Sequence, residues 1–321
     1  NYQRFALVSS THLTFDGSSN ESGTHLSQTT PENQALKWET TEQYNSGLDM
    51  GFFNNRLSVT FDAYYKKTID LLIQKSLPSY SGFYSGQSNV GSIENRGFEI
   101  ELNSNNIDKG DFTWSTQLNL ASNRNKVTDL GGGTDIYLTS SKPMGNVSEE
   151  QFAVIRVGES LGSLFGYVYD GVLQKGETYA PEPNAKPGDP KFKDISGPNG
   201  TPDGKITSAD RQIIGHASPK LIFGLTNTFK YKNFDLSIFL HGSIGNEVLN
   251  MTRMNLEWSR TTDALNRWTS TNTNTDIPRN GFYYSKYGGY INSHFIENAS
   301  FLRCKNVTLG YTIPYKNKVF Q

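Results

Sequence analysis

Apolar and polar side chains alternate along residues 56–67 of this chain. The odd positions from Leu57 to Tyr65 are apolar or aromatic, whereas the even positions from Arg56 to Tyr64 are mostly polar. Successive side chains of a β-strand point to opposite faces, so the pattern predicts a strand with one apolar and one polar surface. A second sheet, a layer of helices or a lipid bilayer are three ways to cover the apolar surface.

The same pattern recurs in pairs of segments joined by short polar turns. The first pair meets at Asn54-Asn55, two residues that tolerate positive φ and favour a tight hairpin. Similar hairpins are predicted around 105–110 and 232–233, and a fourth around 158–160. Two further strands are expected, and these are residues 2–15 and 301–313. Together these segments predict about ten strands, with few helices.

The connections between the predicted strands alternate between short and long. The long ones lie near residues 16–35, 69–91, 129–151, 173–218 and 245–299. Loops above about 12–15 residues are uncommon in compact domains. Outer-membrane barrels, however, have short periplasmic turns and long outside loops. The alternation therefore favours an all-β fold, an antiparallel up-and-down transmembrane β-barrel. A soluble β-sandwich, such as a carbohydrate-binding module or a glycosidase accessory domain, is the alternative.

A barrel in a bilayer turns its apolar positions to lipid and its polar positions to the lumen. The residues expected to face lipid are Phe61, Phe98, Trp114, Leu118, Phe223, Leu236 and Ile238. Aromatic side chains near strand ends are typical of the girdles at the two membrane interfaces. The candidates are Trp38, Tyr64, Tyr65, Trp114, Tyr167, Tyr169 and Tyr311.

The composition narrows the choice of partners. The 321 residues carry a formal net charge of −1, so no general basic field attracts nucleic acid. No run approaches the ~18 apolar residues of a membrane-spanning helix. This criterion does not detect the strands of a membrane barrel, because every second position of such a strand is polar. The only cysteine, Cys304, excludes an internal disulfide.

The sequence offers little support for catalysis. The histidines are scattered and form no H-x-x-x-H pair; they are His12, His25, His216, His241 and His294. The glycine-rich stretches lack the strand–loop–helix context of a phosphate-binding loop. Hydrolysis of a glycoside requires two converging carboxylates, which the sequence does not place. We therefore expect a protein that is not an enzyme.

Residues 187–215 contain a candidate calcium loop. With Asp210 as the last ligand, Asp203 falls at the fifth position and the carbonyl of Lys205 at the seventh, as in loops that wrap Ca²⁺. Asn199 then occupies the first position, where Asp is expected, and Asp194 would have to reach in from outside the motif. The alternative is a turn-rich surface loop held by Asx-type hydrogen bonds.

Aromatic residues also gather in the longest predicted loop. Aromatic faces stack on sugar rings and on peptide side chains, so these residues are candidates for binding substrate or a partner. They are Trp258, Trp268, Tyr283, Tyr284, Tyr287 and Tyr290. The alternative interpretation is that they pack the loop against its neighbours.

Five segments, taken in order, resemble signatures of one transporter family. They are residues 36–68, 91–102, 161–174, 265–279 and 295–314, the last reading FIENASFLRCKNVTLGYTIP. Their sequences are similar to those of the SusC/RagA family of TonB-dependent outer-membrane transporters. The resemblance covers roughly the whole chain, residues 1–321, as a single partial barrel domain.

The resemblance implies a fold and a function. Members of this family have a plug domain inside a 22-stranded barrel, and this chain resembles part of the barrel's C-terminal half. They import large nutrients, usually oligosaccharides or peptides, across the outer membrane of Gram-negative bacteria. The partners implied are a SusD-like surface lipoprotein, the TonB complex, the substrate and the lipid bilayer. No cofactor is required, although the candidate loop leaves Ca²⁺ open.

Overall fold

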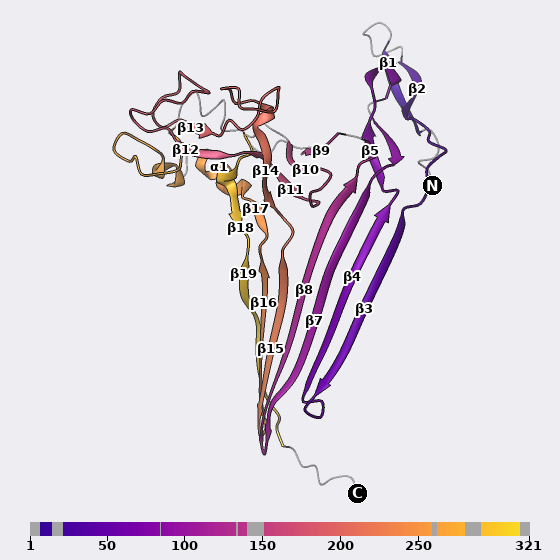
Figure 1. The fold of residues 1–321 in the computed structure, drawn as a ribbon, viewed down its shortest axis with the longest axis vertical. Helices are drawn as coiled ribbons and strands as arrows, with labels where there is room; N and C mark the ends of the chain where they lie inside the picture. The colour runs from indigo at the N-terminus through magenta and orange to yellow at the C-terminus, as the bar shows by residue number, and fades with distance from the viewer. Residues whose placement is uncertain are drawn as a thin grey trace.

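A computed structural model describes residues 7–14, 22–83, 85–132, 134–139, 151–258, 262–279 and 290–314. Its main feature is an antiparallel sheet of seven strands in the order β19-β16-β15-β8-β7-β4-β3 (Figure 1). The strands are β3 (Thr40–Phe52), β4 (Leu57–Ile69), β7 (Ser92–Lys109), β8 (Phe112–Asp129), β15 (Leu221–Tyr231), β16 (Phe234–Ile244) and β19 (Phe301–Tyr311). This arrangement agrees with the predicted antiparallel, up-and-down wall of a barrel.

Three short turns join neighbouring strands of this sheet at one end. They are residues 53–56, 110–111 and 232–233. Asn54 and Asn55 adopt φ angles of 56° and 62°, the left-handed conformation that asparagine tolerates. The predicted hairpins at these turns are therefore confirmed.

The long connections of the sheet all lie at its opposite end, the upper end in Figure 1. They comprise residues 70–91, 130–220 and 245–300. The predicted segregation of short and long connections is thus confirmed, but the expected loops near 129–151 and 173–218 belong to one larger connection. We call the part formed by residues 130–220 and 245–300 the loop region.

Small sheets and short helices occupy the long connections. Their strands are β1 (Leu7–Thr14), β2 (Ser22–Thr30), β5 (Leu72–Ser76), β6 (Ser85–Asn89), β9 (Ile136–Thr139), β10 (Gln151–Ile155), β11 (Ser163–Tyr167), β12 (Tyr169–Val172), β13 (Pro190–Phe192), β14 (Arg211–His216), β17 (Glu247–Leu249) and β18 (Ile296–Asn298). The helices are α1 (Met251–Trp258), η2 (Ser79–Ser81), η3 (Ser208–Asp210), η4 (Thr262–Asn266) and η5 (Ser293–Phe295). Within the described ranges, no helix is both long and apolar enough to cross a membrane.

One predicted hairpin and one predicted barrel strand belong elsewhere. The hairpin of β10 and β11 forms, but it pairs with β9 and β14 in a separate four-stranded sheet of the loop region. β1 pairs with β2 only, also outside the main sheet. The main sheet therefore has seven strands instead of about ten. All five residues of β11 are buried, whereas a barrel strand buries neither face in protein.

The strand register sorts the side chains onto two faces. Phe61 pairs with Ile100, Ile100 with Leu120, and Leu120 with Phe223, which places these residues in one row. All seven residues expected to face lipid share this face, which we call the apolar face. Their neighbours Thr60, Glu101 and Asn119 form the opposite, polar face.

The apolar face is not covered by another layer of the described residues. Phe61 and Phe98 keep 38% of their surface exposed, and Leu302 and Leu309 keep 67% and 72%. The described residues place no second sheet across Phe61, which a β-sandwich would require. A large exposed apolar surface of this kind marks contact with a partner or with lipid.

The residues predicted for aromatic girdles lie in different parts of the structure. Trp114 and Tyr311 lie on the apolar face near the turns, where the indole of Trp114 donates a hydrogen bond to Asn227 at 2.9 Å. Tyr64, in contrast, lies on the polar face and donates to Asn123 at 3.1 Å. Tyr167 is buried in the loop region, 3% exposed, and Tyr169 lies in the same region.

Candidate functional site

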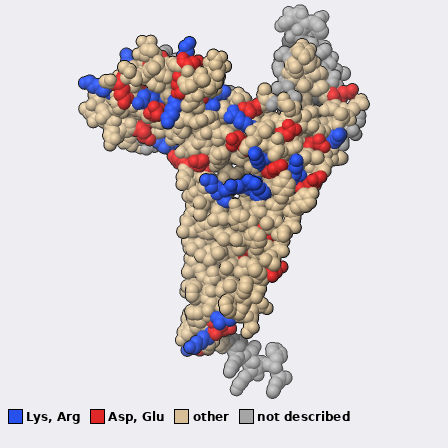
Figure 2. Space-filling model, in the orientation of Figure 1, with Lys and Arg blue, Asp and Glu red and all other residues tan. Residues whose placement is uncertain are grey.

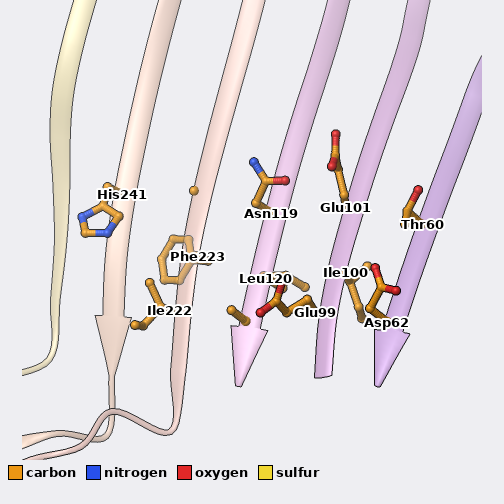
Figure 3. A pocket seen from close by; sticks show the side chains of 12 residues that line it. Thr60, Asp62, Glu99, Ile100, Glu101, Asn119, Leu120, Ile222, Phe223 and His241 are labelled. Carbon is orange, nitrogen blue, oxygen red and sulfur yellow. The ribbon is translucent and has the colours of Figure 1, made fainter. Parts of the chain in front are cut away.

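The polar face carries a row of hydrophilic residues that crosses the entire sheet. Register pairs place Asp49 beside Thr60, then Glu101 and Asn119, and finally His241 beside Arg303 across Gly224. The alternation of the strands produces this row, because each contributing residue sits one position from an apolar one. Figure 3 shows the side chains of Thr60, Glu101, Asn119 and His241 on four different strands.

A shallow hollow of about 320 Å³ lies on this part of the sheet. Its lining includes Asp62 and Glu99, which are direct register partners on the polar face. Like charges directly opposite each other are unfavourable in a sheet. Two carboxylates kept at such positions favour contact with water or with a cationic or hydrogen-bonding group of a solute.

Charge is distributed unevenly over the polar face. Asp49 accepts a hydrogen bond from the hydroxyl of Thr60 at 2.7 Å, and Glu101 accepts one from the amide of Asn103 at 2.8 Å. These carboxylates lie on β3 and β7, whereas Arg303 lies across the sheet on β19. The polar face therefore carries carboxylates on β3 and β7 and a guanidinium group on β19, a surface suited to binding hydrated, polar molecules.

A glycine leaves room for one tyrosine side chain on the polar face. Gly97 lies opposite Tyr64, and a Cβ atom added at Gly97 would stand 2.5 Å from the hydroxyl oxygen of Tyr64. The absence of a side chain at Gly97 lets the phenol cross the strand and reach Asn123. Gly97 thus sets the position of a hydrogen-bonding tyrosine on the polar face.

Two of the predicted aromatic binding residues pack within the loop region. Tyr290 stacks on Tyr167 with ring centroids 4.5 Å apart, and both contact Phe192. The indole of Trp268 donates a hydrogen bond to the side-chain oxygen of Gln174 at 3.1 Å. These contacts match the alternative that the aromatic residues hold the loop against its neighbours.

The other aromatic candidates are not placed by the structure. Tyr283, Tyr284 and Tyr287 lie outside the described residues, as does the side chain of Trp258, whose backbone ends α1. Their predicted role in binding a substrate or partner stays a prediction.

Asp210, the proposed last calcium ligand, is a fully buried structural residue. Its carboxylate accepts backbone N–H groups from Ile195 at 2.9 Å, Ser196 at 3.1 Å and Thr207 at 2.7 Å. Thr207 and Asp210 also form a capping box at the short helix η3. Asp210 therefore fastens the two ends of the 195–207 loop together.

The remaining predicted calcium ligands form a second set of contacts. Asp194 does reach in, and it accepts N–H groups of Asp203 at 3.3 Å and Gly204 at 2.6 Å. Asp203 accepts the N–H of Lys205 at 3.0 Å, and Asn199 lies in the turn before them. Among the described residues, no three His, Cys, Asp or Glu side chains are grouped so that they could hold a metal. The geometry matches the alternative of an Asx-type loop, and calcium binding by the five residues stays a prediction.

The loop region also contains a buried ionic cluster that the sequence did not suggest. The carboxylate of Glu257 lies 2.7 Å from Nε of Arg253 and 2.9 Å from Nε2 of His294. The side chains of Glu257 and His294 are 3% and 4% exposed. Burial lowers the pKa of Arg253, but the hydrogen bond and charge of Glu257 outweigh it and raise that pKa overall. The cluster joins α1 to η5.

Comparison with known proteins identifies a family for this chain. The family model described as "TonB dependent receptor-like, beta-barrel" matches residues 5–202. TonB-dependent receptor P3 of Formosa agariphila is 40% identical over 289 residues, which are 88% of this chain and 28% of the relative. TonB-dependent receptor SusC of Bacteroides thetaiotaomicron is 35% identical over 294 residues, 90% of this chain and 28% of the relative.

Two solved structures also superimpose on this chain. A structure of the RagAB peptide transporter superimposes with a TM-score of 0.76 at 26% identity, covering 98% of this chain and 33% of that chain. The RagAB peptide importer in its "closed-closed" state gives a TM-score of 0.73 at 27% identity, with coverage of 98% and 33%. The chain thus spans 28% of the length of the curated relatives named above.

Proposed function

Because this chain belongs to the TonB-dependent receptor β-barrel family, we propose that it forms part of the wall of an outer-membrane transporter that imports large nutrients. The observation that carries the proposal is the two-faced sheet, apolar on one side and polar on the other, with all its long connections at one end. That is the arrangement expected of a wall between lipid and an aqueous lumen, with the long loops outside the cell.

The proposed substrates are oligosaccharides or peptides. A wall of carboxylates, hydroxyls and amides supports passage of a hydrated, polar solute over passage of an apolar one. The RagAB neighbours are described as peptide transporters. Import would use energy from the TonB complex, and a SusD-like lipoprotein would cap the long loops. The relatives are named as receptors, which supports a function without catalysis.

Uptake measurements test the proposal. Labelled oligosaccharides and labelled oligopeptides are offered to cells with the natural full-length protein, to cells that lack it and to cells that lack TonB. We expect uptake of at least one class that disappears in both deletion strains. Equal uptake by all three strains would refute the transport function.

The location of the protein is tested separately. We expect the natural full-length protein in the outer-membrane fraction, with a heat-dependent shift on a gel that is typical of folded barrels. Recovery in the soluble fraction would favour the β-sandwich alternative. Capture of a lipoprotein together with the tagged protein tests the SusD-like partner.

A matched pair of variants links uptake to the polar face. Changing Asp62 and Glu99 to Asn and Gln removes two charges from the hollow but keeps similar shapes. We expect altered uptake of charged substrates, whereas Lys230→Gln, on the polar face next to a turn, should leave uptake unchanged. Identical uptake by both variants would separate the hollow from the transport path.

Calcium binding remains a separate prediction for the 194–210 loop. Titration calorimetry of the natural full-length protein with Ca²⁺, compared with Asp203→Ala, decides it. Heat that the variant loses would support binding. No heat above buffer in the unmutated protein would leave the backbone N–H contacts as the complete role of these carboxylates.

A further inference from the structure

The apolar face has a sharp upper boundary of charge. Along β7 its positions are uncharged from Phe98 down to Ile107, and the next residues on this face are Arg96 above and Lys109 below. About ten residues suffice for a tilted strand to cross the hydrocarbon core. Figure 2 shows this uncharged region, with Lys and Arg gathered along its upper limit and a second charged group at its lower tip. Arg96 therefore marks the level at which hydrocarbon gives way to headgroups.

Four cations meet at this boundary, on the end that carries the long loops. Arg96 and Arg124 are direct register partners on the apolar face, and Lys126 follows two residues further along the same face of β8. Lys220 lies in the segment just before β15, where its carbonyl oxygen accepts a hydrogen bond from the hydroxyl of Ser122 at 2.7 Å, and it lines one hollow together with Arg124. All four side chains are exposed. We call this group the cationic patch.

The cationic patch has more positive charge than nearby carboxylates offset. Within the described part of the chain, no carboxylate oxygen lies within 4.0 Å of these four cations. Glu94 is the register partner of Lys126, and Glu159 lines the same hollow as Arg124 and Lys220. Like charges on directly opposed residues repel, so Arg96 and Arg124 are best stabilised by an anion between them.

A hollow beside the patch has room for a headgroup. The register pairs of β8 and β15 end at Ala121 and Ile222. A hollow of about 360 Å³ next to this point is lined by Arg124, Lys220, His216 and Glu159, and also by Asn123, which the register places on the polar face. Guanidinium groups bind phosphate oxygens through two parallel hydrogen bonds. The two arginines therefore favour a phosphate group over an uncharged sugar.

From these observations we infer that the cationic patch binds the phosphate group of a phosphorylated glycolipid in the outer leaflet. The lipid's acyl chains would lie on the apolar face below Arg96, and its phosphate group would lie between Arg96 and Arg124. The inference rests on the placement of the sheet in the outer membrane but not on import, so loss of nutrient uptake and loss of lipid binding are separate outcomes.

Native mass spectrometry of the natural full-length protein tests the inference. The protein in mild detergent is titrated with phosphorylated lipid A and, separately, with the dephosphorylated form. We expect Arg96→Gln combined with Arg124→Gln to weaken binding of the phosphorylated lipid by about tenfold or more, and to leave the weaker binding of the dephosphorylated form unchanged. The matched control is Lys109→Gln with Lys232→Gln, which removes the same charge at the turn end and should bind as the unmutated protein does.

Several results would overturn the inference. They are equal binding by the arginine variant, an equal loss in the control, and no preference of the unmutated protein for the phosphorylated lipid. Displacement of the lipid by inorganic phosphate alone would also overturn it, since the acyl contacts would then contribute nothing. If the arginine variant shows no heat-dependent gel shift and is unfolded, Lys126→Gln with Lys220→Gln decides the matter by the same criteria.

Discussion

Replacing Asp210 with alanine removes the acceptor for three backbone N–H groups, those of Ile195, Ser196 and Thr207. A hydrogen bond to a charged group contributes about 1.5 kcal/mol at the low end of its range, so three of them contribute about 4.5 kcal/mol to holding the loop closed. Since every 1.36 kcal/mol is a factor of ten, local opening of the loop should become about a thousandfold more frequent.

Hydrogen exchange followed by mass spectrometry measures this opening. Peptides covering residues 193–208 of the natural full-length protein should exchange about a thousandfold faster in Asp210→Ala, and Asp210→Asn should fall between, because one carbonyl acceptor remains. Asp203→Ala is the matched control, since it removes a single bond, to the N–H of Lys205, in an exposed turn. Exchange in Asp210→Ala that stays within about threefold of the unmutated protein would refute the reasoning.

Three further predictions concern the sheet and the loop region. Leu118→Arg places a charge on the apolar face and should lower the free energy of unfolding in lipid vesicles by about 2–4 kcal/mol, whereas Asn119→Arg on the polar face should lower it little. Equal losses would contradict the assignment of the apolar face to lipid. Gly97→Ala places a Cβ atom against the backbone carbonyl oxygen of Ser122 as well as the hydroxyl of Tyr64, and should lose about 1–3 kcal/mol in the same denaturant assay. Gly51→Ala, which meets only the side chain of Asn55, should lose less. Glu257→Ala removes the buried acceptor of Arg253 and His294, which keep Asp276 at 3.5 Å and 3.4 Å as a shared acidic neighbour, and should loosen the loop region by about 1.5–3 kcal/mol, seen as faster proteolysis between residues 251 and 298. Glu297→Ala loses a 3.6 Å contact with Arg253 and a 2.9 Å hydrogen bond from Asn250 at a position that is 39% exposed, so it should raise the proteolysis rate less than Glu257→Ala does.

The sequence predicted the main sheet well because alternation and turn chemistry act over short distances. Leu57 to Tyr65 alternate, Asn54-Asn55 forms the turn, and the partner strand follows at once. It assigned too many strands to that sheet because β11 also reads as a strand. The residues of β11 include Leu164, Phe165 and Tyr167 in succession, with only Gly166 between, and that continuous burial distinguishes it from a strand that alternates.

The sites were harder to predict because their partners are far apart in sequence. Glu257 and His294 meet although 37 positions separate them, and no local pattern links an isolated histidine to a helix. Asp210 fits a calcium motif by spacing, but its oxygens are directed at backbone N–H groups, a choice that depends on how residues 195 and 196 approach. Spacing alone does not distinguish a carboxylate that binds a cation from one that binds amides.

The outermost strands of the main sheet, β3 and β19, each pair along one side only within the described chain. In hydrocarbon no water replaces a missing partner, and each unsatisfied N–H or C=O group costs several kcal/mol. The sheet therefore inserts stably into a bilayer only together with neighbouring strands that close the barrel. Produced without such strands, these residues would expose the unpaired backbone groups of two edge strands. Association of these edges between molecules would then lead to aggregation in competition with membrane insertion.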